Sequence, residues 1–325
     1  MVSFFCSQKM KRTVIDIGTN TILMLIAEYD KQSKNIKTIL DIQRVPRLGK
    51  GVDKNRNILP ESTGKAIEIL NEYGFISLKH GSEKITATAT SFIRDSHNRE
   101  EFLQEIRENT GINIEILSGA DEAKWTFTGG VYDKIPDKPA RLTTIDIGGG
   151  STEITTTINP LKSFDELPTA VLNGRSLNIG SVRINEKFLS HHPPAFESIA
   201  GAELFINEHL DQINFDLSGS SLIGVAGTIT TLGAIVLGLD KFESAKVDDL
   251  VITIGEIDEV LRRLIPMPLE ELYGMGDYMT GRADIVIPGI LILKCFMQKF
   301  GYAEVKVSTK GLRYGVFLRD ALFNR

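Results

Sequence analysis

The chain has 325 residues, of which 42% are hydrophobic and 24% charged, with a formal net charge of −5. This length predicts two domains, and the composition is that of an ordinary globular protein whose charge argues against bulk nucleic-acid binding. No apolar run reaches the roughly 18–20 residues of a membrane span. Two cysteines do not build a disulfide framework, which favours a cytoplasmic location. Residues 1–10 are predicted to be an extension, because Met10 would itself serve as a start.

The first half begins with three predicted strands and continues with helices and short strands. Strands are predicted at 12–17, 21–29, 36–44, 84–88 and 113–116, and helices at 61–79 and 98–110. The first helix rests on apolar spacing. The second opens with the capping-box-like Asn98–Glu101 and ends before Gly111.

The second half repeats this order after residue 140. Strands are predicted at 141–147, 151–158, about 164–173, 221–226 and 303–308, and helices near 180–190, 195–212, 228–238, 255–264, 282–299 and from about 312. Both halves therefore read as a β-meander followed by alternating helices and strands.

The tetrapeptide Ile-Asp-Ile-Gly occurs twice, ending an apolar strand each time, with Asp16 and Asp146 at the same position. A chance recurrence explains four residues but not the matching order of elements. The repeat predicts an α/β fold of two like domains, each with a mixed sheet, facing a central cleft. We place the first domain at 11–134, with a C-terminal helix at about 314–325, and the second at 135–313.

The two turns after these strands carry the residues typical of a phosphate site. A strand-end aspartate is costly to bury without a cation, and glycines let backbone N–H groups converge on an anion. The turn residues are Thr19, Asn20 and Thr21 in the first copy and Gly148, Gly149, Gly150, Ser151 and Thr152 in the second. Together they predict a phosphate clamp with Mg²⁺, which prefers oxygen ligands. A single such turn would be equally well explained as a structural hairpin.

A third glycine-containing turn includes Gly227 and Thr228, between a predicted strand and a helix. The N-terminus of that helix would present free N–H groups to an anion. A capped buried helix explains the same residues equally well.

Glu122 lies in the first turn of a helix that begins near Ser118, just before the second domain. The helix dipole favours a negative charge there, and an ionised carboxylate facing the phosphate turns would suit a general base. An ordinary helix-start acid is the alternative.

Four arginines are candidates for phosphate oxygens, because a planar guanidinium matches that geometry. They are Arg94, Arg183, Arg282 and Arg313. Each alone is more simply explained as a surface or ion-pair arginine.

These stretches together resemble the exopolyphosphatase/guanosine pentaphosphate phosphohydrolase (Ppx/GppA) family. The resemblance is carried, in order over residues 12–315, by IDIGTNT, ATATSFIRDSHNREEFL, EILSGADEA, IDIGGGSTE, NIGSVR, AGTITTL, GRADIVIPG and STKGLRYG. It implies the duplicated ribonuclease-H-like fold shared with actin, sugar kinases and related chaperones. It also implies Mg²⁺-dependent removal of the terminal phosphate from polyphosphate or, as the alternative, pppGpp, with a role in the stringent response.

The resemblance assigns roles to individual residues. It implies Glu122 as the catalytic glutamate, Asp146 in the phosphate turn, and Glu153 as the acid linked to metal and water, so that Asp16, Asp146 and Glu153 become the candidate metal ligands. Arg94 matches an arginine on the polyanion path. The chain departs from the family at Leu23, where many relatives carry arginine or histidine.

Two other classes fit parts of the pattern. A sugar or acetate kinase would use Glu122 to activate an acceptor hydroxyl, and an actin- or chaperone-type protein would hold ATP and turn it over slowly. We expect a polyanionic substrate as the partner, with no nucleic acid and no membrane, and leave a homodimer open.

Overall fold

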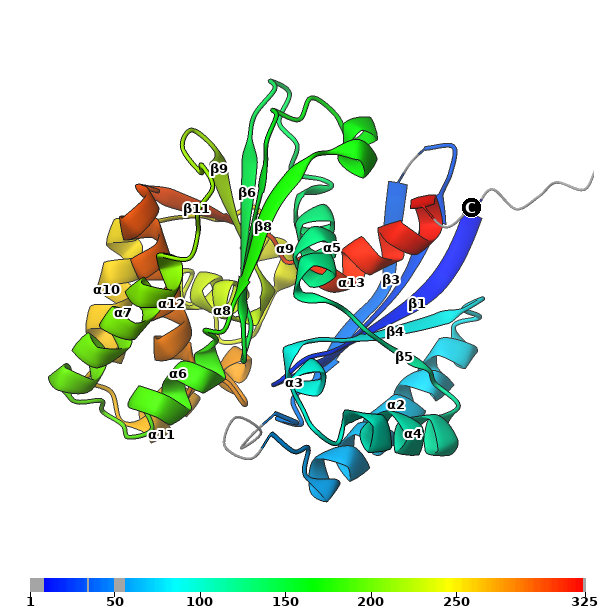
Figure 1. The fold of residues 1–325 in the computed structure, drawn as a ribbon, viewed down its shortest axis with the longest axis horizontal. Helices are drawn as coiled ribbons and strands as arrows, with labels where there is room; N and C mark the ends of the chain where they lie inside the picture. Colours follow the sequence, from blue (N-terminus) through cyan, green and yellow to red (C-terminus); the bar gives the residue numbers. More distant parts are fainter. Residues whose placement is uncertain (1–8, 34, 50–55, 324–325) are drawn as a thin grey trace, which may run out of the picture. The chain divides into compact units, whose positions relative to one another are not determined.

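The structure, a computed structural model, describes residues 9–33, 35–49 and 56–323. The chain divides into two compact units, residues 1–118 with 312–325 as unit 1 and Gly119–Gly311 as unit 2 (Figure 1). Both are α/β, as predicted. The predicted extension at 1–10 falls largely outside the described residues, and Lys9 and Met10 already belong to the first strand.

Unit 1 is built on a five-stranded mixed sheet in the order β3-β2-β1-β4-β5. Its strands are β1 (Lys9–Ile17), β2 (Ile22–Asp30), β3 (Asn35–Arg44), β4 (Ile85–Ala89) and β5 (Ile114–Ile116). Its helices are α2 (Pro60–Lys79), α3 (Ser91–Arg94), α4 (Arg99–Thr110), α13 (Leu312–Leu318) and the π-helical η3 (Arg319–Phe323). The first three strands form the predicted meander, and β4 and β5 run parallel to β1.

The two faces of this sheet are covered by different helices (Figure 1). Ile15 and Ile17 point into a core shared with α2 and α4. Since side chains alternate along a strand, Asp16 points to the opposite face, against which α13 packs.

Unit 2 has a six-stranded sheet in the order β8-β7-β6-β9-β11-β10, the same order as unit 1 with one strand added at the edge. Its strands are β6 (Leu142–Ile147), β7 (Thr152–Thr157), β8 (Leu172–Leu177), β9 (Ser221–Val225), β10 (Val251–Thr253) and β11 (Glu304–Val307). Its α-helices are α5 (Gly119–Val131), α6 (Ser181–Phe188), α7 (Phe196–Leu210), α8 (Ala226–Val236), α9 (Ser244–Val247), α10 (Ile254–Leu264), α11 (Leu269–Tyr273) and α12 (Val286–Phe300). Two short 3₁₀ helices complete it, η1 (Phe164–Thr169) and η2 (Asp277–Met279).

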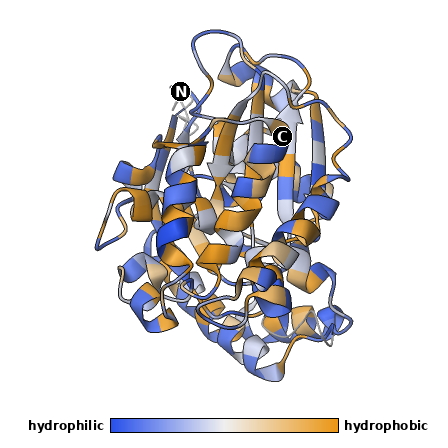
Figure 2. Ribbon diagram, turned by 90° about the vertical axis from the view of Figure 1, so that its left-hand side faces the viewer, coloured by the Kyte–Doolittle hydropathy of each residue, from blue (hydrophilic) through white to orange (hydrophobic). Residues whose placement is uncertain are grey.

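The faces of the second sheet are equally distinct. Ile145, Ile147 and Ile154 enter the main hydrophobic core, to which α6, α7, α8, α10 and α12 contribute. The other face is covered by α5, which crosses β8, β7, β6 and β9 (Figure 1). Figure 2 shows hydrophobic residues in the helices as well as in the strands, with hydrophilic residues between them.

The division between the units falls at Ser118/Gly119, earlier than the expected 134/135 boundary. The reason is the packing of α5, which follows the last strand of unit 1 in the chain but lies on the sheet of unit 2. In return α13, which follows the last strand of unit 2, packs on β1 and β2.

Local predictions were wrong at β8 and at the start of α4. The strand expected at about 164–173 is the 3₁₀ helix η1, and β8 begins only at Leu172, because Pro168 cannot donate to a strand ladder. Asn98 does not cap α4 with its side chain, which instead bonds both backbone groups of Ile58 at 2.8 and 3.0 Å. The predicted end of α4 is confirmed by left-handed Gly111 (φ 70°).

Among the described residues, no helix combines the length and the apolar character that a membrane crossing requires.

Candidate active site

The β6–β7 turn of unit 2 contains the three consecutive glycines. The Gly148 N–H donates to the Ser151 carbonyl at 3.0 Å, which closes the tight hairpin. A side chain at Gly148 would place its Cβ 3.1 Å from the same oxygen, so the turn favours glycine there.

The start of α6 braces this turn from one side. The backbone N–H groups of Ser181 and Val182 donate to the carbonyls of Gly148 and Gly149 at 2.9 and 3.0 Å. Arg183 completes the brace, since its Nε donates to the Gly150 carbonyl at 2.9 Å. All three glycine carbonyls are therefore directed toward α6.

The contact between the turn and its brace is too close for a side chain. A Cβ at Gly180 would lie 2.3 Å from the Gly149 carbonyl oxygen and 2.6 Å from the Gly150 nitrogen. Because these neighbours are backbone atoms, no rotamer change relieves the clash.

The brace decides the direction of the turn's N–H groups. In a planar trans peptide the N–H points opposite to the carbonyl of the preceding residue. With the carbonyls of residues 148–150 bonded to α6, the N–H groups of Gly149, Gly150 and Ser151 are directed away from it. Successive N–H groups of this kind form an anion-binding concavity.

The acids of the second repeat lie together on the α5 face of the sheet. Asp146 and Glu153 are direct partners in the antiparallel β6–β7 pair, so their side chains share one face. That face is identified by Thr155, two residues after Glu153, whose Oγ1 donates to the Ala123 carbonyl of α5 at 3.3 Å. Asp146 is half-buried, and Glu153 is only 2% exposed.

Glu122 projects from the first turn of α5, and it is buried. Gly119 approaches Ser176, and Ala123 approaches Gly174, so this side of the helix lies on β8. Glu122 is within one turn of both contact residues and borders the sheet-facing side. The three predicted acids, Glu122, Asp146 and Glu153, therefore belong to one helix–sheet interface.

Ser176 is an additional polar residue of this interface. Its hydroxyl donates to Glu153 Oε1 at 2.6 Å, and the two residues are register partners of β8 and β7. Charge-assisted hydrogen bonds of this length fix the orientation of a carboxylate.

The third predicted turn joins β9 to α8, and it contains a strained residue. Ala226, the first residue of α8, has a φ of 66°. A non-glycine residue in this region costs about 1–2 kcal/mol, and such strain is common at functional sites. The Thr228 hydroxyl donates to the Ile147 carbonyl at 3.1 Å, which connects this turn to the end of β6.

Arg282 lies against the same turn. A Cβ at Gly227 would fall 1.9 Å from Arg282 Nη1, so the guanidinium occupies the space that the glycine leaves. Burial lowers the pKa of Arg282 to about 10, and the side chain still carries its charge at neutral pH. Arg282 precedes α12, which begins at Val286, although the sequence predicted it at the start of that helix.

The turn of unit 1 has the same design with different partners. Gly18 N–H donates to the Thr21 carbonyl at 2.9 Å. The carbonyls of Thr19 and Asn20 accept hydrogen bonds from the backbone N–H groups of Gly49 (2.8 Å) and Arg47 (3.1 Å). The segment 47–49 thus braces this turn as α6 braces the other.

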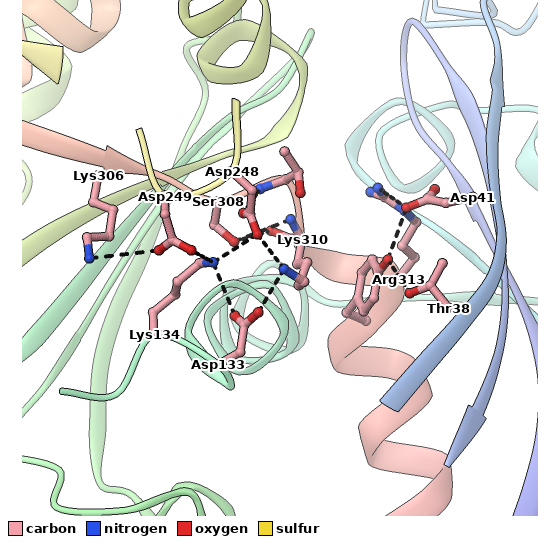
Figure 3. Close-up of polar contacts among 12 residues, drawn as sticks. Thr38, Asp41, Asp133, Lys134, Asp248, Asp249, Lys306, Ser308, Lys310 and Arg313 are labelled. Atoms are coloured by element: carbon pink, nitrogen blue, oxygen red, sulfur yellow. Dashed lines mark hydrogen bonds and ion pairs between the residues drawn. The ribbon is translucent and has the colours of Figure 1, made fainter. Parts of the chain in front are cut away.

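Asp16 is half-buried on the α13 face of the first sheet. Burial raises the pKa of Asp16 to about 6, opposed by the charge of Arg313. Arg313 is itself held by a two-point ion pair with Asp41, Nε–Oδ1 at 2.9 Å and Nη2–Oδ2 at 2.8 Å (Figure 3). The charge of Arg313 therefore interacts with two carboxylates of unit 1, those of Asp41 and Asp16.

Arg94 closes α3 in unit 1, and its Nη1 donates to the Leu117 carbonyl at 3.0 Å. This contact holds the chain at the end of unit 1. Arg94 is the last residue of the short helix α3, which follows β4 in the chain.

An ionic cluster fixes the far end of α5. Lys134 Nζ lies 3.0 Å from both Asp248 and Asp249, and Lys310 Nζ lies 2.6 Å from Asp248 and 2.7 Å from Asp133 (Figure 3). Since Asp133 and Lys134 lie in the turn that follows α5, the cluster connects the end of this helix to the segment after β11.

Within the described ranges, no group of three or more His, Cys, Asp or Glu side chains could hold a metal ion. The pair Asp146 and Glu153 nevertheless offers two carboxylates on one face. Mg²⁺ is commonly held by one or two carboxylates, with substrate phosphates and waters supplying the other ligands. The residues present fit that mode.

Sequence reasoning missed Ser176, Gly180 and Ala226. Ser176 lies in β8, the strand that was misplaced, and so had no assigned face. Gly180 belongs to the NIGSVR stretch, in which Arg183 was the residue named as a candidate. Ala226 carries no sequence signal for a positive φ.

Comparisons with known proteins match nearly the whole chain. A family model described as the Ppx/GppA phosphatase family matches residues 25–323. The chain is 33% identical over 317 residues to a bifunctional 3-dehydroquinate synthase/phosphatase of Fusobacterium nucleatum, covering 94% of this chain but only 46% of that protein. It is 28% identical to exopolyphosphatase 2 of Mycobacterium tuberculosis, covering 94% of this chain and 96% of the relative.

Solved structures match over nearly the whole chain as well. A crystal structure of an exopolyphosphatase-like protein has a TM-score of 0.88 at 28% identity, covering 97% of this chain and all of the other. The Aquifex aeolicus member of the Ppx/GppA family has a TM-score of 0.79 at 26% identity, covering 98% and 99%. The chain therefore belongs to the Ppx/GppA phosphatase family and is a phosphoric anhydride hydrolase.

Proposed function

We propose that the chain is a Mg²⁺-dependent exopolyphosphatase, which releases the terminal phosphate of inorganic polyphosphate. The family and the mycobacterial relatives named exopolyphosphatase support this activity. The observation that carries the proposal is the α5 face of unit 2. Asp146 and Glu153 lie there on the two strands that the glycine turn joins, Glu122 is buried in the first turn of α5, and the N–H groups of the turn are directed away from its brace.

The turn is the proposed binding site of the terminal phosphate. The N–H groups of Gly149, Gly150 and Ser151 would donate to its oxygens, and the positive charge of Arg282 at the β9–α8 turn would offset further negative charge. The hydroxyls of Thr152 and Thr228 already donate to the carbonyls of Ile179 (2.6 Å) and Ile147 (3.1 Å), so we assign them to holding the turns in shape.

Glu122 is the proposed general base, because a carboxylate in the first turn of a helix is favoured in its ionised form. It would accept a proton from the attacking water as the water's oxygen bonds to the terminal phosphorus. The bond from that phosphorus to the bridging oxygen breaks, and the shortened chain leaves with its electron pair. Phosphoryl transfer of this kind depends mainly on positioning and charge neutralisation.

Asp146 and Glu153 are the proposed carboxylate ligands of Mg²⁺, and Ser176 orients Glu153. The ion, when bound, would neutralise charge on the phosphate oxygens. In unit 1, Thr19, Asn20 and Arg94 are proposed to form a second set of polyanion-binding residues, and Asp16 is proposed as a further carboxylate for Mg²⁺.

The general base is tested with Glu122→Gln, which keeps the shape of the side chain. Phosphate release from polyphosphate should fall about 10²–10⁴-fold, the usual contribution of a general base. Asp121→Asn is the matched control, because Asp121 lies in the same helical turn and is exposed. Turnover of Glu122→Gln close to that of the wild type would exclude the assignment.

The substrate is tested by a phosphate-release panel of polyphosphate, pppGpp and ATP, each with Mg²⁺ and with EDTA. We expect polyphosphate to be the preferred substrate and EDTA to abolish release. Preference for pppGpp would indicate that the chain is a pppGpp phosphohydrolase that uses the same site. Release that requires an acceptor molecule would instead indicate a kinase.

A further inference from the structure

Thr126 of α5 has a hydroxyl that the proposed mechanism does not use. The residue is only 1% exposed, and within the described part of the chain its Oγ1 has no hydrogen-bond partner. A buried hydroxyl without a partner destabilises a fold, whereas valine has the same shape without that cost. A threonine at such a position therefore indicates a partner outside the protein.

The Thr126 hydroxyl does not form the hydrogen bond to its own helix that a helical threonine usually forms. A helical threonine commonly donates to the carbonyl four residues earlier, as Thr128 does to Lys124 at 2.9 Å. For Thr126 that acceptor would be the Glu122 carbonyl, and the side chain does not bond it. Thr126 and Thr128 thus differ in the same helix, one unpaired and one paired.

The position of Thr126 follows from its neighbours along the helix. Three residues earlier, Ala123 approaches Gly174 and accepts a hydrogen bond from Thr155, over β7 and β8. Four residues later, a Cβ at Gly130 would meet Val225 at 2.8 Å and Thr144 at 3.6 Å, over β9 and β6. Between these contacts the helix crosses the β6–β7 pair.

The β6–β7 pair carries Asp146 and Glu153 on this same face. Thr126 also lies one helical turn after Glu122, on the same side of α5. The buried, unpaired hydroxyl of Thr126 is therefore carried by the helix that also carries Glu122, where that helix crosses the strands of the other two acids.

We infer that Thr126 is a positioning residue, whose hydroxyl holds an ordered water in the interface between α5 and the β6–β7 pair and thereby fixes the hydrogen-bonding geometry of Glu122. The inference rests on the proposed role of Glu122 as general base. Thr126 itself does not contact the substrate.

The test compares Thr126→Val, Thr126→Ser and Thr128→Val by kinetics and thermal unfolding. Thr126→Val should lower kcat for phosphate release about tenfold, leave KM unchanged, and leave Tm equal or higher. Thr126→Ser should restore kcat, because it restores the hydroxyl. Thr128→Val should lower Tm slightly and leave kcat unchanged.

A crystal structure of the wild-type protein provides a readout that does not depend on activity. We expect an ordered water within hydrogen-bond distance of Thr126 Oγ1, and we expect Thr126→Val to lack it. A site without such a water, or a kcat for Thr126→Val within twofold of an active wild type, would overturn the inference. Inactivity of the wild type toward every phosphate substrate would instead contradict the proposed function, and the water would still decide the role of Thr126.

Discussion

The β1–β2 turn of unit 1 and the β6–β7 turn of unit 2 share a backbone design and differ in their side chains. In both, the glycine after the strand donates to the carbonyl three residues later, at 2.9 and 3.0 Å. In both, the backbone N–H groups of a separate segment donate hydrogen bonds to the turn carbonyls. The segment is residues 47–49 in unit 1 and residues 181–183 in unit 2. The duplication thus preserved two braced turns.

The difference lies opposite the repeated aspartate. Asp146 has Glu153 as its cross-strand partner, and Ser176 fixes that carboxylate. Asp16 has Leu23 at the equivalent place. Charge opposite Asp16 comes instead from Arg313, which is bound to Asp41. The same frame therefore presents a pair of acids in one unit and a single acid beside a cation in the other, which is why we assign the chemistry to unit 2.

Exchanging the two partners tests this assignment and should have the largest effect. Glu153→Leu, which copies unit 1, should reduce phosphate release at least 100-fold, because it removes one of the two proposed metal-binding carboxylates. Its Tm is measured alongside as the control for folding, because the substitution also leaves the Ser176 hydroxyl without its acceptor. The measurement is steady-state phosphate release at varied Mg²⁺ concentration.

The reciprocal variant, Leu23→Glu, is the control for that exchange. It introduces a second carboxylate next to Asp16 and should give no gain in activity. A Leu23→Glu protein that rescued Glu153→Leu in the double variant would show that the two turns are interchangeable.

The braces of the two turns differ in how a side chain would be accommodated. Gly180→Ala would place its Cβ 2.3 Å from a backbone carbonyl, whereas Gly49→Ala would place it 2.3 Å from Thr19 Cγ2. A side chain can rotate away and a backbone cannot. Gly180→Ala should therefore lower the free energy of unfolding by about 3 kcal/mol, at the upper end of overpacking effects, and Gly49→Ala by about 1 kcal/mol. Urea denaturation measures both, and equal losses would contradict the comparison.

The smallest effect concerns the raised pKa of Asp16. With a folded-state pKa of about 6 and an ordinary value of 3.8, the folded protein keeps a proton between these pH values that the unfolded chain has released. Stability is therefore lost as pH rises from 4 to 6, and the cost persists above pH 6. Asp16→Asn removes that cost, so it should stabilise the protein at pH 7.5 by about 1–2 kcal/mol, discounted for partial solvent exposure, and by nothing near pH 3.5.

Asp216 is the control of opposite sign. Hydrogen bonds from Ser218 and then Arg141 lower the pKa of Asp216 to about 2. Asp216→Asn should therefore destabilise at pH 7.5, with the effect fading below pH 3. Thermal unfolding followed across this pH range measures both variants, and a pH-independent change for Asp16→Asn would contradict the raised pKa.

Much of the fold was predictable because it depends on local patterns. The apolar alternation of β1 and β6, the repeated Ile-Asp-Ile-Gly and the left-handed Gly111 after α4 are each read within a few residues. The prediction of a strand at 164–173 was wrong because the local pattern there is ambiguous. Apolar residues next to Pro168 do not distinguish a strand from a 3₁₀ helix.

The candidate acids were named from the sequence in different ways: Asp146 from its place at a strand end before consecutive glycines, Glu122 from its place in the first turn of a helix, and Glu153 from the family resemblance. Glu122, Asp146 and Glu153 were all named as candidates. Their presence on a single face was not predictable for Glu122, because it depends on α5 leaving the unit that precedes it in the chain and packing on β6–β8.

The sequence alone therefore determined most of the elements and the positions of the two turns, since these follow from the local periodicity and conformational freedom of the chain. Only the tertiary structure decided which partner each group has. Leu23 and Glu153 became equivalent through strand register, the glycine carbonyls were directed by α6, and Thr126 was left unpaired where α5 crosses the sheet. Such pairings join residues that are distant in the chain. Their geometry is set by tertiary packing, which a local sequence pattern does not specify.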